Sequence, residues 1–320
     1  MLYYICMKNI LVVGDIYTET QFHTEIIPRE NEFAFASEST TTVGSKTINV
    51  ARVLAKLGNT VTFCGVVGND KDGNQINSEL KEFNINPLLT QKIGMSTGKI
   101  SLITPKSGKS SVVLSSGANM ALTPDLISQI EINQYDGVYT TTALPLNTLY
   151  RLAEICHKSA IPIFVDVPNQ QVDLDLSQLV QVDFIMPNRQ EAELISGQKI
   201  NNIEDAKNIA KFLREKIQGS IIITLDKEGC VVMEANRLES EHFPVRNVET
   251  IDETGAGDIF RAAFVNKWLE SSDITGSVKI ALDLATDSVL IKGVNASIEN
   301  VDSSTAVGMT NEMVGMMDIE

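Results

Sequence analysis

The residues best suited to chemistry lie at positions 252–258, which read Asp-Glu-Thr-Gly-Ala-Gly-Asp. Gly255, Ala256 and Gly257 are small, so the backbone can turn tightly there and approach a ligand closely. An apolar run over residues 259–269 follows, so we expect a helix whose N-terminal amides and dipole attract an anion. Asp258 falls in the first turn, where its carboxylate can accept a proton from an attacking hydroxyl while the amides hold a transferred phosphoryl group. Taken alone, the motif fits a simple glycine turn with an ordinary first-turn acid equally well.

The segments that must position this turn alternate between two patterns. Six short apolar runs rich in β-branched residues predict buried parallel strands that are covered on both faces. These runs are Asn9–Gly14, Thr60–Gly65, Gly137–Thr141, Ile161–Val167, Asp183–Pro187 and Ser220–Thr224. Helical periodicity lies between them, over residues 50–57, 146–159 and 206–217, and Thr123 with Pro124 has the pattern of a helix start. This alternation predicts an α/β fold with a doubly wound, mainly parallel sheet flanked by helices.

Two polar stretches rich in Thr and Ser interrupt the alternation, at residues 17–42 and 97–116. Their locally alternating pattern predicts antiparallel strands that project from the main sheet. We interpret them as a small β-strand lid over the active site, with a surface β-ribbon as the alternative. The sequence therefore predicts one domain over residues 1–302 and a polar tail over residues 303–320.

The composition argues against several classes of protein. The chain has 320 residues, of which 43% are hydrophobic, and its formal net charge is −15. Such an acidic surface repels phosphate backbones and anionic lipid headgroups, so we expect neither nucleic acid nor a membrane as a partner. No window reaches the ~20 apolar residues that a membrane span needs. The four cysteines form no C-x-x-C pair and the three histidines have no metal-ligand spacing, which predicts reduced thiols, a cytoplasmic protein and no zinc site.

The motif at residues 252–258, D-x-T-G-A-G-D, is similar to the signature of the ribokinase-like (PfkB) carbohydrate kinase family. Five more segments resemble motifs of that family, in the family's order, within about residues 8–300. They are residues 43–51 (VGSKTINVA), 65–73 (GVVGNDKDG), 117–123 (GANMALT), 187–193 (PNRQEAE) and 224–229 (TLDKEG). The resemblance implies a ribokinase-like fold and an ATP-dependent kinase that phosphorylates a hydroxyl of a small sugar. It also implies Asp258 as the catalytic base and Mg²⁺ as a cofactor.

The resemblance implies roles for residues outside the glycine turn as well. The sugar would bind among Asp15, Glu19, Gly44, Lys46 and Asn49. The nucleotide would lie against Asn188, Glu191, Thr224 and Gly229, with Glu191 holding Mg²⁺ through water. Asp252 and Ser297 match a monovalent-cation site, which suggests K⁺ as a further ion. From the residues alone, Asp252 fits a loop-capping acid equally well, and Lys46 also fits a solvated surface lysine.

Several positions depart from the family pattern, and they bear on the substrate. They are Tyr17, Glu19, Ser45, Thr47, Ala143 and Asp226. Ser45 and Thr47 replace glycines beside the sugar, which makes that segment bulkier and less flexible. Tyr17 and Glu19 stand where ribose-specific members resemble Asn and Asp, and Ala143 stands where those members carry a sugar-binding Glu. Asp226 replaces a glycine near the nucleotide. These changes leave ribose itself in question.

Three hypotheses about function remain open. The leading one is a kinase for an unphosphorylated sugar, either ribose or a related ketose. The alternative is a nucleoside or sugar-phosphate kinase, and a sugar phosphate would require an additional basic residue near the lid, such as Lys99, Lys106 or Lys109. The third is a sensor that binds a sugar and ATP without turnover, against which the retained Asp258 and Glu191 argue. The resemblance also suggests a homodimer formed through the lids.

Overall fold

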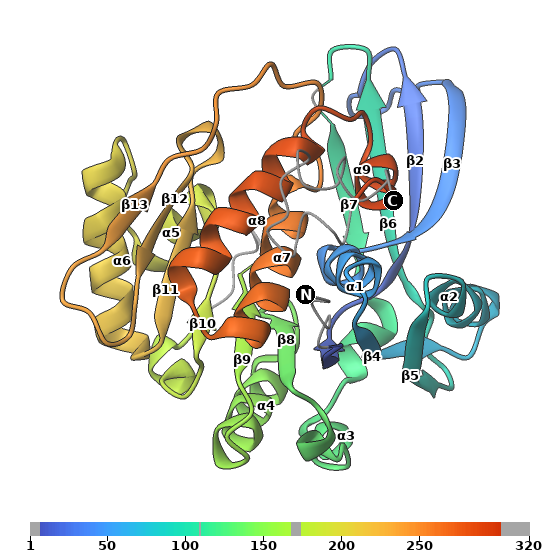
Figure 1. The fold of residues 1–320 in the computed structure, drawn as a ribbon. Helices are drawn as coiled ribbons and strands as arrows, with labels where there is room; N and C mark the ends of the chain where they lie inside the picture. Colours follow the sequence, from blue (N-terminus) through green and yellow to red (C-terminus); the bar gives the residue numbers. More distant parts are fainter. Residues whose placement is uncertain (1–6, 109, 168–173, 302–320) are drawn as a thin grey trace, which may run out of the picture.

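A nine-stranded sheet forms the centre of the computed structural model, which describes residues 7–108, 110–167 and 174–301 (Figure 1). The strand order is β13-β12-β11-β10-β9-β8-β1-β4-β5. Neighbouring strands are parallel except at β12, which runs antiparallel to both β11 and β13. The bounds are β1 Asn9–Val13, β4 Thr60–Gly68, β5 Ile85–Lys92, β8 Gly137–Thr141, β9 Ile163–Asp166, β10 Phe184–Ile185, β11 Ser220–Thr224, β12 Cys230–Met233 and β13 Glu241–Phe243. The predicted mainly parallel α/β sheet is confirmed.

All six predicted strands are present, and the sheet contains three more that the sequence patterns did not indicate. One of these, β5, contains Pro87 and lies at the edge of the sheet, where a residue without an N–H is tolerated. The other two, β12 and β13, are short strands at the opposite edge. The strand predicted over residues 183–187 is reduced to the two residues of β10, and Pro187 at its end cannot donate to a neighbouring strand.

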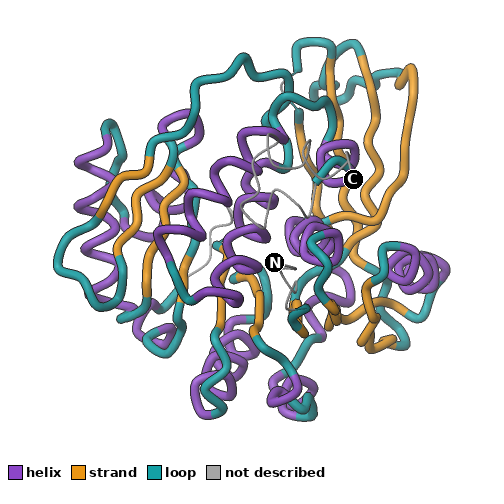
Figure 2. The backbone as a smooth tube through the Cα atoms, viewed as in Figure 1, coloured by secondary structure: helices purple, strands orange, loops and turns teal. Residues whose placement is uncertain are grey.

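Helices cover both faces of the sheet (Figures 1 and 2). One face carries α1 (Lys46–Lys56), α2 (Lys71–Glu82), α7 (Ala256–Ser271), α8 (Ile274–Ser288) and α9 (Val294–Glu299). The other carries α3 (Pro124–Ser128), α4 (Leu146–Lys158), α5 (Arg189–Ser196) and α6 (Ile203–Ile217). Short 3₁₀ turns occur at Gly117–Ala121, Ile132–Gln134, Leu176–Leu179 and Asp226–Glu228. The three predicted helical segments correspond to α1, α4 and α6, and Thr123 caps α3 by accepting from the Leu126 amide.

The helix after the glycine turn, α7, lies at the centre of its layer. Every residue from Asp258 to Asn266 in it is buried. A helix that is enclosed on all sides needs apolar residues around most of its circumference, which explains the mainly apolar character of this segment, with Asp258, Arg261 and Asn266 as its buried polar residues. The first turn of α7 is therefore held rigidly against the sheet.

The two polar stretches form a separate four-stranded sheet in the order β3-β2-β6-β7, at one side of the main sheet (Figures 1 and 2). Its strands are β2 (Tyr17–Thr24), β3 (Ala36–Gly44), β6 (Gly98–Pro105) and β7 (Ser111–Ser115). The prediction of antiparallel strands is wrong for the central pair, because β2 and β6 are parallel. Strand β2 follows β1 and forms an antiparallel hairpin with β3, and strand β6 follows β5 and forms an antiparallel hairpin with β7. Because both hairpins leave the main sheet in the same direction, their first strands run parallel to each other.

Two polar side chains, buried Asn119 and half-buried Asp70, hold the base of this small sheet. Asn119 accepts a hydrogen bond from the Ile16 amide at 2.9 Å and donates to the Ile16 carbonyl at 2.9 Å. Asp70 accepts from the Thr97 amide at 2.8 Å and from the Thr97 hydroxyl at 2.6 Å. Because backbone groups that are buried without partners are destabilising, these side chains fix where each hairpin leaves the main sheet. Residues 303–320, predicted to be a tail, lie outside the described residues.

Candidate active site

The residues predicted to bind ligands meet at the carboxyl ends of the parallel strands. Asp15 follows β1, Asn188 follows β10 and Thr224 ends β11, and Asp166, which was not among the predicted residues, ends β9. Ligands of open α/β sheets bind at this edge, because the loops and helix N-termini that can surround a ligand converge there. The glycine turn before α7 lies over the same edge, so the sheet collects residues that are far apart in the sequence.

The glycine turn has the geometry that its composition indicates. Gly255 is the N-cap of α7 and has a φ of 87°, a left-handed conformation that favours glycine. A Cβ atom there would lie 2.4 Å from Cγ2 of Val294, so the position also has no room for a side chain. The Ala256 amide donates to the Glu253 carbonyl at 3.3 Å. Within the described ranges, the amides of Gly255 and Gly257 have no acceptor, so these two amides can hold an anion.

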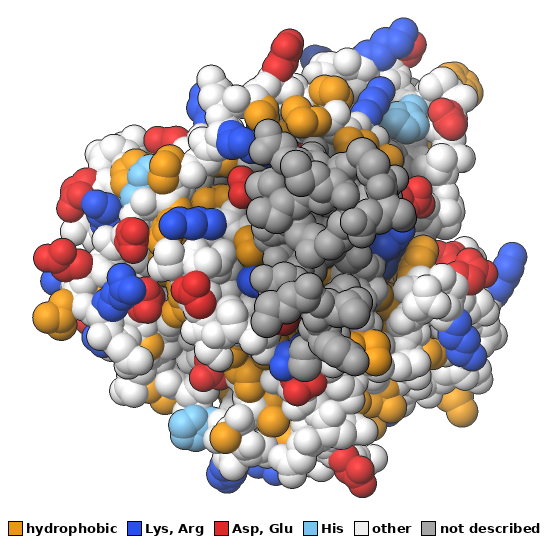
Figure 3. Space-filling view, in the orientation of Figure 1, with side chains coloured by type: hydrophobic (Ala, Val, Ile, Leu, Met, Phe, Trp, Pro, Cys, Tyr) orange, Lys and Arg blue, Asp and Glu red, His pale blue; other side chains and the backbone are white. Residues whose placement is uncertain are grey.

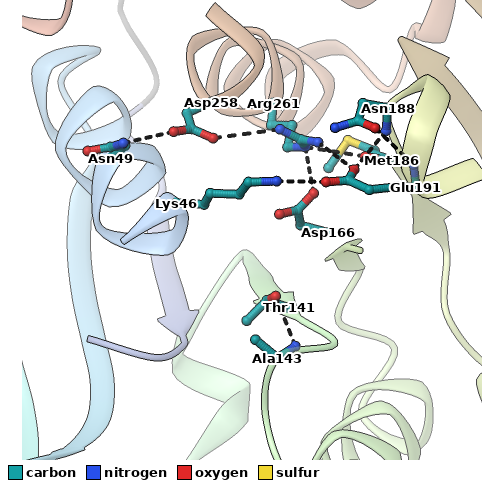
Figure 4. A network of polar contacts seen from close by, with 10 residues as sticks. All are labelled: Lys46, Asn49, Thr141, Ala143, Asp166, Met186, Asn188, Glu191, Asp258 and Arg261. Atoms are coloured by element: carbon teal, nitrogen blue, oxygen red, sulfur yellow. Dashed lines mark hydrogen bonds and ion pairs between the residues drawn. The ribbon is translucent and has the colours of Figure 1, made fainter. Parts of the chain in front are cut away.

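Asp258 lies beside these amides and is only 6% exposed. Its Oδ2 accepts a hydrogen bond from Asn49 Nδ2 of α1 at 2.8 Å, and its Oδ1 lies 3.6 Å from Nη1 of Arg261 (Figure 4). Burial raises the pKa of Asp258 to about 6, although the charge of Arg261 and the Asn49 hydrogen bond act in the opposite direction. A carboxylate with such a pKa is ionised at neutral pH and can still accept a proton.

Charged side chains connect Asp258 to the other motifs. Nη2 of Arg261 lies 3.3 Å from Oε2 of Glu191, and its Nε lies 2.8 Å from Oδ1 of Asp166. From α1, Lys46 reaches across to Glu191, with Nζ 2.6 Å from Oε1 (Figure 4). Lys46 is therefore an ion-pair partner of the N-x-x-E motif, with a side chain that is 43% exposed. Sequence patterns did not identify Arg261 or Asp166, although an arginine inside an apolar helix and an aspartate ending a buried strand are both signals of a buried charge pair.

The N-x-x-E motif forms a capping box at the start of α5. Oδ1 of Asn188 accepts from the Glu191 amide at 2.9 Å, and Oε2 of Glu191 accepts from the Asn188 amide at 2.8 Å. Glu191 is fully buried, and each of its carboxylate oxygens already has a partner. No group of three or more His, Cys, Asp or Glu side chains in the described part of the chain could hold a metal ion. Both oxygens of Glu191 are already engaged with Lys46 and the Asn188 amide.

The predicted sugar-binding residues gather around the end of β1. Asp15 is 9% exposed, and its Oδ1 accepts a hydrogen bond from the Thr47 hydroxyl at 2.9 Å. Burial is the main cause of its raised pKa. Glu19 lies over Gly44, where an added Cβ would be 3.4 Å from Oε2 of Glu19. Ala143 follows β8 at the edge of the site and brings no carboxylate there (Figure 4).

A pocket beside the glycine turn is lined by two of the four predicted nucleotide residues, Thr224 and Gly229, but not by Asn188 or Glu191. Ala256 and Gly257 also line it. The rest of the wall comes from the loop before the glycine turn and from α8 with its C-cap. The apolar residues of this wall include Val245, Val248, Leu282, Ala285 and Val289. Asp226, which replaces a glycine of the family, lines the same pocket with a left-handed φ of 52°. The pocket joins an apolar wall to free amides, which suits a ligand with an aromatic base and a phosphate chain.

Asp252 and Ser297 converge on one loop. The two carboxylate oxygens of Asp252 accept from the amides of Thr254 and Gly293, each at 2.9 Å. The Ser297 hydroxyl lies 3.1 Å from the Gly293 carbonyl and 3.2 Å from the Ser288 carbonyl. Asp252 therefore caps two backbone segments, in agreement with its interpretation as a loop-capping acid.

Comparison with known proteins decides the family. The model of the pfkB family carbohydrate kinases matches residues 7–301. The chain belongs to this family. This confirms the resemblance carried by the six motifs, and the protein is a sugar or nucleoside kinase of the pfkB family.

Individual relatives of this kinase are distant but cover nearly all of it. It is 26% identical to a deoxyribokinase of Salmonella typhi over 95% of this chain and 100% of the relative. It is 27% identical to a ribokinase of Haemophilus influenzae over 91% of this chain and 95% of the relative. The structure of Giardia lamblia ribokinase is similar with a TM-score of 0.84 at 21% identity, covering 94% of this chain and 99% of that one. These similarities confirm the predicted ribokinase-like fold.

The surface of the kinase carries charges of both signs. On the face in Figure 3, acidic and basic side chains are interleaved over the visible helices and strands. Across the described ranges, no helix is both long and apolar enough to cross a membrane.

The geometry predicts that Asp258 titrates far from the usual range of an aspartate. Carbon-13 NMR of the carboxyl groups should give it a pKa of about 6, and Asn49→Ala should raise this value because the variant loses a hydrogen bond to the ionised form. The carboxyl signal of Asp258 is assigned as the one that disappears from the spectrum of the Asp258→Asn variant. A pKa near the ~3.9 of an unperturbed aspartate would contradict the burial described above.

Proposed function

We propose that this kinase transfers the γ-phosphoryl group of ATP to a hydroxyl of an unphosphorylated sugar, with Asp258 as the general base. One observation carries the proposal. The Asp258 carboxylate accepts a hydrogen bond from Asn49 of α1, and it belongs to the first turn of α7, where the Gly255 and Gly257 amides have no acceptor among the described residues. A hydroxyl bound beside Asn49 would have a proton acceptor on one side and an anion site in line with it.

The roles of the surrounding residues follow from this geometry. Asp258 accepts the proton of the attacking hydroxyl, and the amides of Gly255 and Gly257 hold the transferred group. Asn49, which can donate and accept hydrogen bonds, orients both Asp258 and the acceptor. Mg²⁺, when bound with ATP, would neutralise negative charge on the phosphates, and Glu191 with Asn188 would hold it through water. The lid excludes water from this space when it covers the site.

Named relatives support ATP and a pentose as ligands. The relatives include deoxyribokinase and ribokinases, and one similar structure is Arabidopsis thaliana ribokinase complexed with ribose and ATP. We propose that ATP occupies the pocket lined by Thr224, Gly229 and Gly257. We propose further that the sugar lies among Asp15, Glu19, Gly44, Lys46 and Asn49.

Charges near the acceptor position argue against a sugar phosphate. Lys46 is paired with Glu191, and the lid lysines Lys99 and Lys106 are paired with acidic neighbours at 2.8 and 2.7 Å. Lys109 lies outside the described residues. Meanwhile the acceptor side carries the carboxylates of Asp15, Glu19 and Asp258. A phosphate on the acceptor would meet like charges without a free cation among the described lysines of the lid, so an uncharged sugar fits better.

A coupled assay of ADP formation over pentoses, deoxypentoses, hexoses, nucleosides and sugar phosphates tests this function. We expect turnover with an unphosphorylated sugar, and we expect Asp258→Asn to lower kcat by at least ~10²-fold while ATP affinity changes little. A guanosine-inosine kinase of Exiguobacterium acetylicum is also a relative, at 27% identity, so preferred turnover of nucleosides would identify the second candidate function. Tight sugar binding without turnover would instead indicate a sensor.

We propose that K⁺ binds near Asp252 and Ser297. The carbonyls of Ser288, Ile291 and Gly293 surround the Ser297 hydroxyl, and carbonyl oxygens are ligands that monovalent cations accept. We expect a higher rate in K⁺ than in Na⁺ at equal ionic strength, and we expect Ser297→Val to abolish the difference. Equal rates in both salts would show that these residues only stabilise the loop.

We also propose a homodimer formed through the lid. Three consecutive apolar residues of β7, Val112, Val113 and Leu114, are exposed by 58%, 67% and 41%. Burial of such a strand against a second copy is favourable. Sedimentation velocity should detect a dimer, and Val113→Glu should shift the protein to the monomer. A monomeric parent enzyme at micromolar concentration would contradict the proposal.

A further inference from the structure

Arg261 is a buried arginine whose guanidinium meets three carboxylates from three elements. It is 3% exposed and lies one turn after Asp258 on α7. Its nitrogens lie 2.8 Å from Asp166 at the end of β9, 3.3 Å from Glu191 on α5, and 3.6 Å from Asp258 (Figure 4). Its Nε also donates a hydrogen bond to the Met186 carbonyl at 3.2 Å. One side chain therefore connects the glycine-turn helix to the N-x-x-E helix and to the sheet.

The same guanidinium lies directly against the glycine turn. A Cβ atom built on Gly257 would be 3.1 Å from Nη1 of Arg261. Gly257 also lines the proposed nucleotide pocket, so the guanidinium packs behind the residue whose amide is free to hold an anion. Because Arg261 is almost completely enclosed, it supports the turn from behind and does not itself touch a ligand.

Asp166 is the counter-ion that keeps Arg261 in this place. It is fully buried, and neither of its carboxylate oxygens accepts a hydrogen bond from the described residues, although Oδ1 lies 2.8 Å from Nε of Arg261. A buried carboxylate without hydrogen bonds is strongly unfavourable unless a cation compensates it. Removing Arg261 would therefore leave Asp166 as an uncompensated buried charge, whereas removing Asp166 would leave Arg261 with Glu191 and Asp258.

We propose that Arg261, held by Asp166, is a positioning residue that fixes the carboxylates of Asp258 and Glu191 relative to the glycine turn. The inference rests on the proposed kinase function. Without the guanidinium, the three carboxylates would repel one another, and Lys46, half exposed on α1, would be the remaining cation of the network. Asp258 would then lose its fixed orientation toward the acceptor.

The charged and titratable groups around Asp258 come from every element packed against it. They are Lys46 of α1, Tyr139 of β8, Asp166 of β9, Glu191 of α5 and Arg261 of α7. Arg261 and Lys46 favour the ionised form of Asp258, whereas Asp166 disfavours it. Neutral substitutions of Arg261 and of Asp166 therefore have opposite effects on the ionisation of the base.

The test compares Arg261→Met, Arg261→Lys and Asp166→Asn with the parent enzyme, using the sugar that gives the highest turnover. Arg151→Met is the matched control, because Arg151 forms an exposed ion pair with Glu154 on α4. We expect kcat per folded molecule to fall by about 10²-fold in Arg261→Met, since a small misplacement of reacting groups has an effect of this size. We expect a smaller loss in Arg261→Lys and ATP affinity within about threefold of the parent.

The pH profile separates positioning from a merely structural role. The acidic limb of kcat/KM should move to higher pH in Arg261→Met and to lower pH in Asp166→Asn. A structural role would reduce the folded fraction, measured by thermal unfolding, and leave the limb unchanged in both variants. If Arg261→Met does not fold, Asp166→Asn still tests the shift of the limb to lower pH, and Arg261→Lys, which keeps the positive charge, tests the loss of kcat with the limb nearly unchanged.

An unchanged kcat per folded molecule, or limbs that move in the same direction, would overturn the inference. These outcomes differ from a failure of the proposed function. If the parent enzyme phosphorylates no sugar, the proposed function itself is wrong. If the parent is active and the Arg261 and Asp166 variants match Arg151→Met, only the positioning role is wrong.

Discussion

The hydrogen bond between Asn49 and Asp258 is the contact on which the site depends. It spans 209 residues and joins α1, which follows the lid, to α7, which follows the glycine turn. Both helices pack on the same face of the central sheet, so the contact requires the whole of that layer to be in place. The enclosure that creates the contact also removes water from the carboxylate and raises its pKa. Packing of one helical layer thus determines both the position of the Asp258 carboxylate and the pH range in which it is ionised.

The sequence predicted the parts of the molecule that depend on local patterns. The alternation of strands and helices predicted the sheet, and the three small residues of the turn predicted the helix start, where two amides have no acceptor among the described residues. The network around Arg261 was not predicted, since no local pattern pairs an arginine of α7 with Asp166 of β9. The capping box was available from the sequence, because Asn188 and Glu191 have the required three-residue spacing. The parallel pairing of β2 with β6 depends on where β1 and β5 end, so it required the tertiary structure.

The departures from the family pattern act together in the folded chain. Thr47 bonds to the Asp15 carboxylate and the Asp15 carbonyl, and Ser45 bonds to the same carbonyl at 2.8 Å. A Cβ atom at Gly14 would lie 2.6 Å from Thr47, so the glycine makes room for the threonine. Side-chain hydrogen bonds therefore hold a segment that glycines would leave flexible. The carboxylate of Asp15 therefore lies at the end of β1, whereas Ala143, after β8, supplies no carboxylate to the site.

The connection between the lid and α1 has a mechanical consequence. A single residue, Ser45, separates the end of β3 from the start of α1, and β2 is paired with β3 and β6 along its whole length. The four strands are therefore held together as one unit, and β3 joins that unit directly to the helix that carries Lys46 and Asn49. A displacement of this sheet would therefore act on Asn49, whose side chain holds the carboxylate of Asp258. The covalent link between sheet and helix thus ties the position of the proton acceptor to the position of the small sheet.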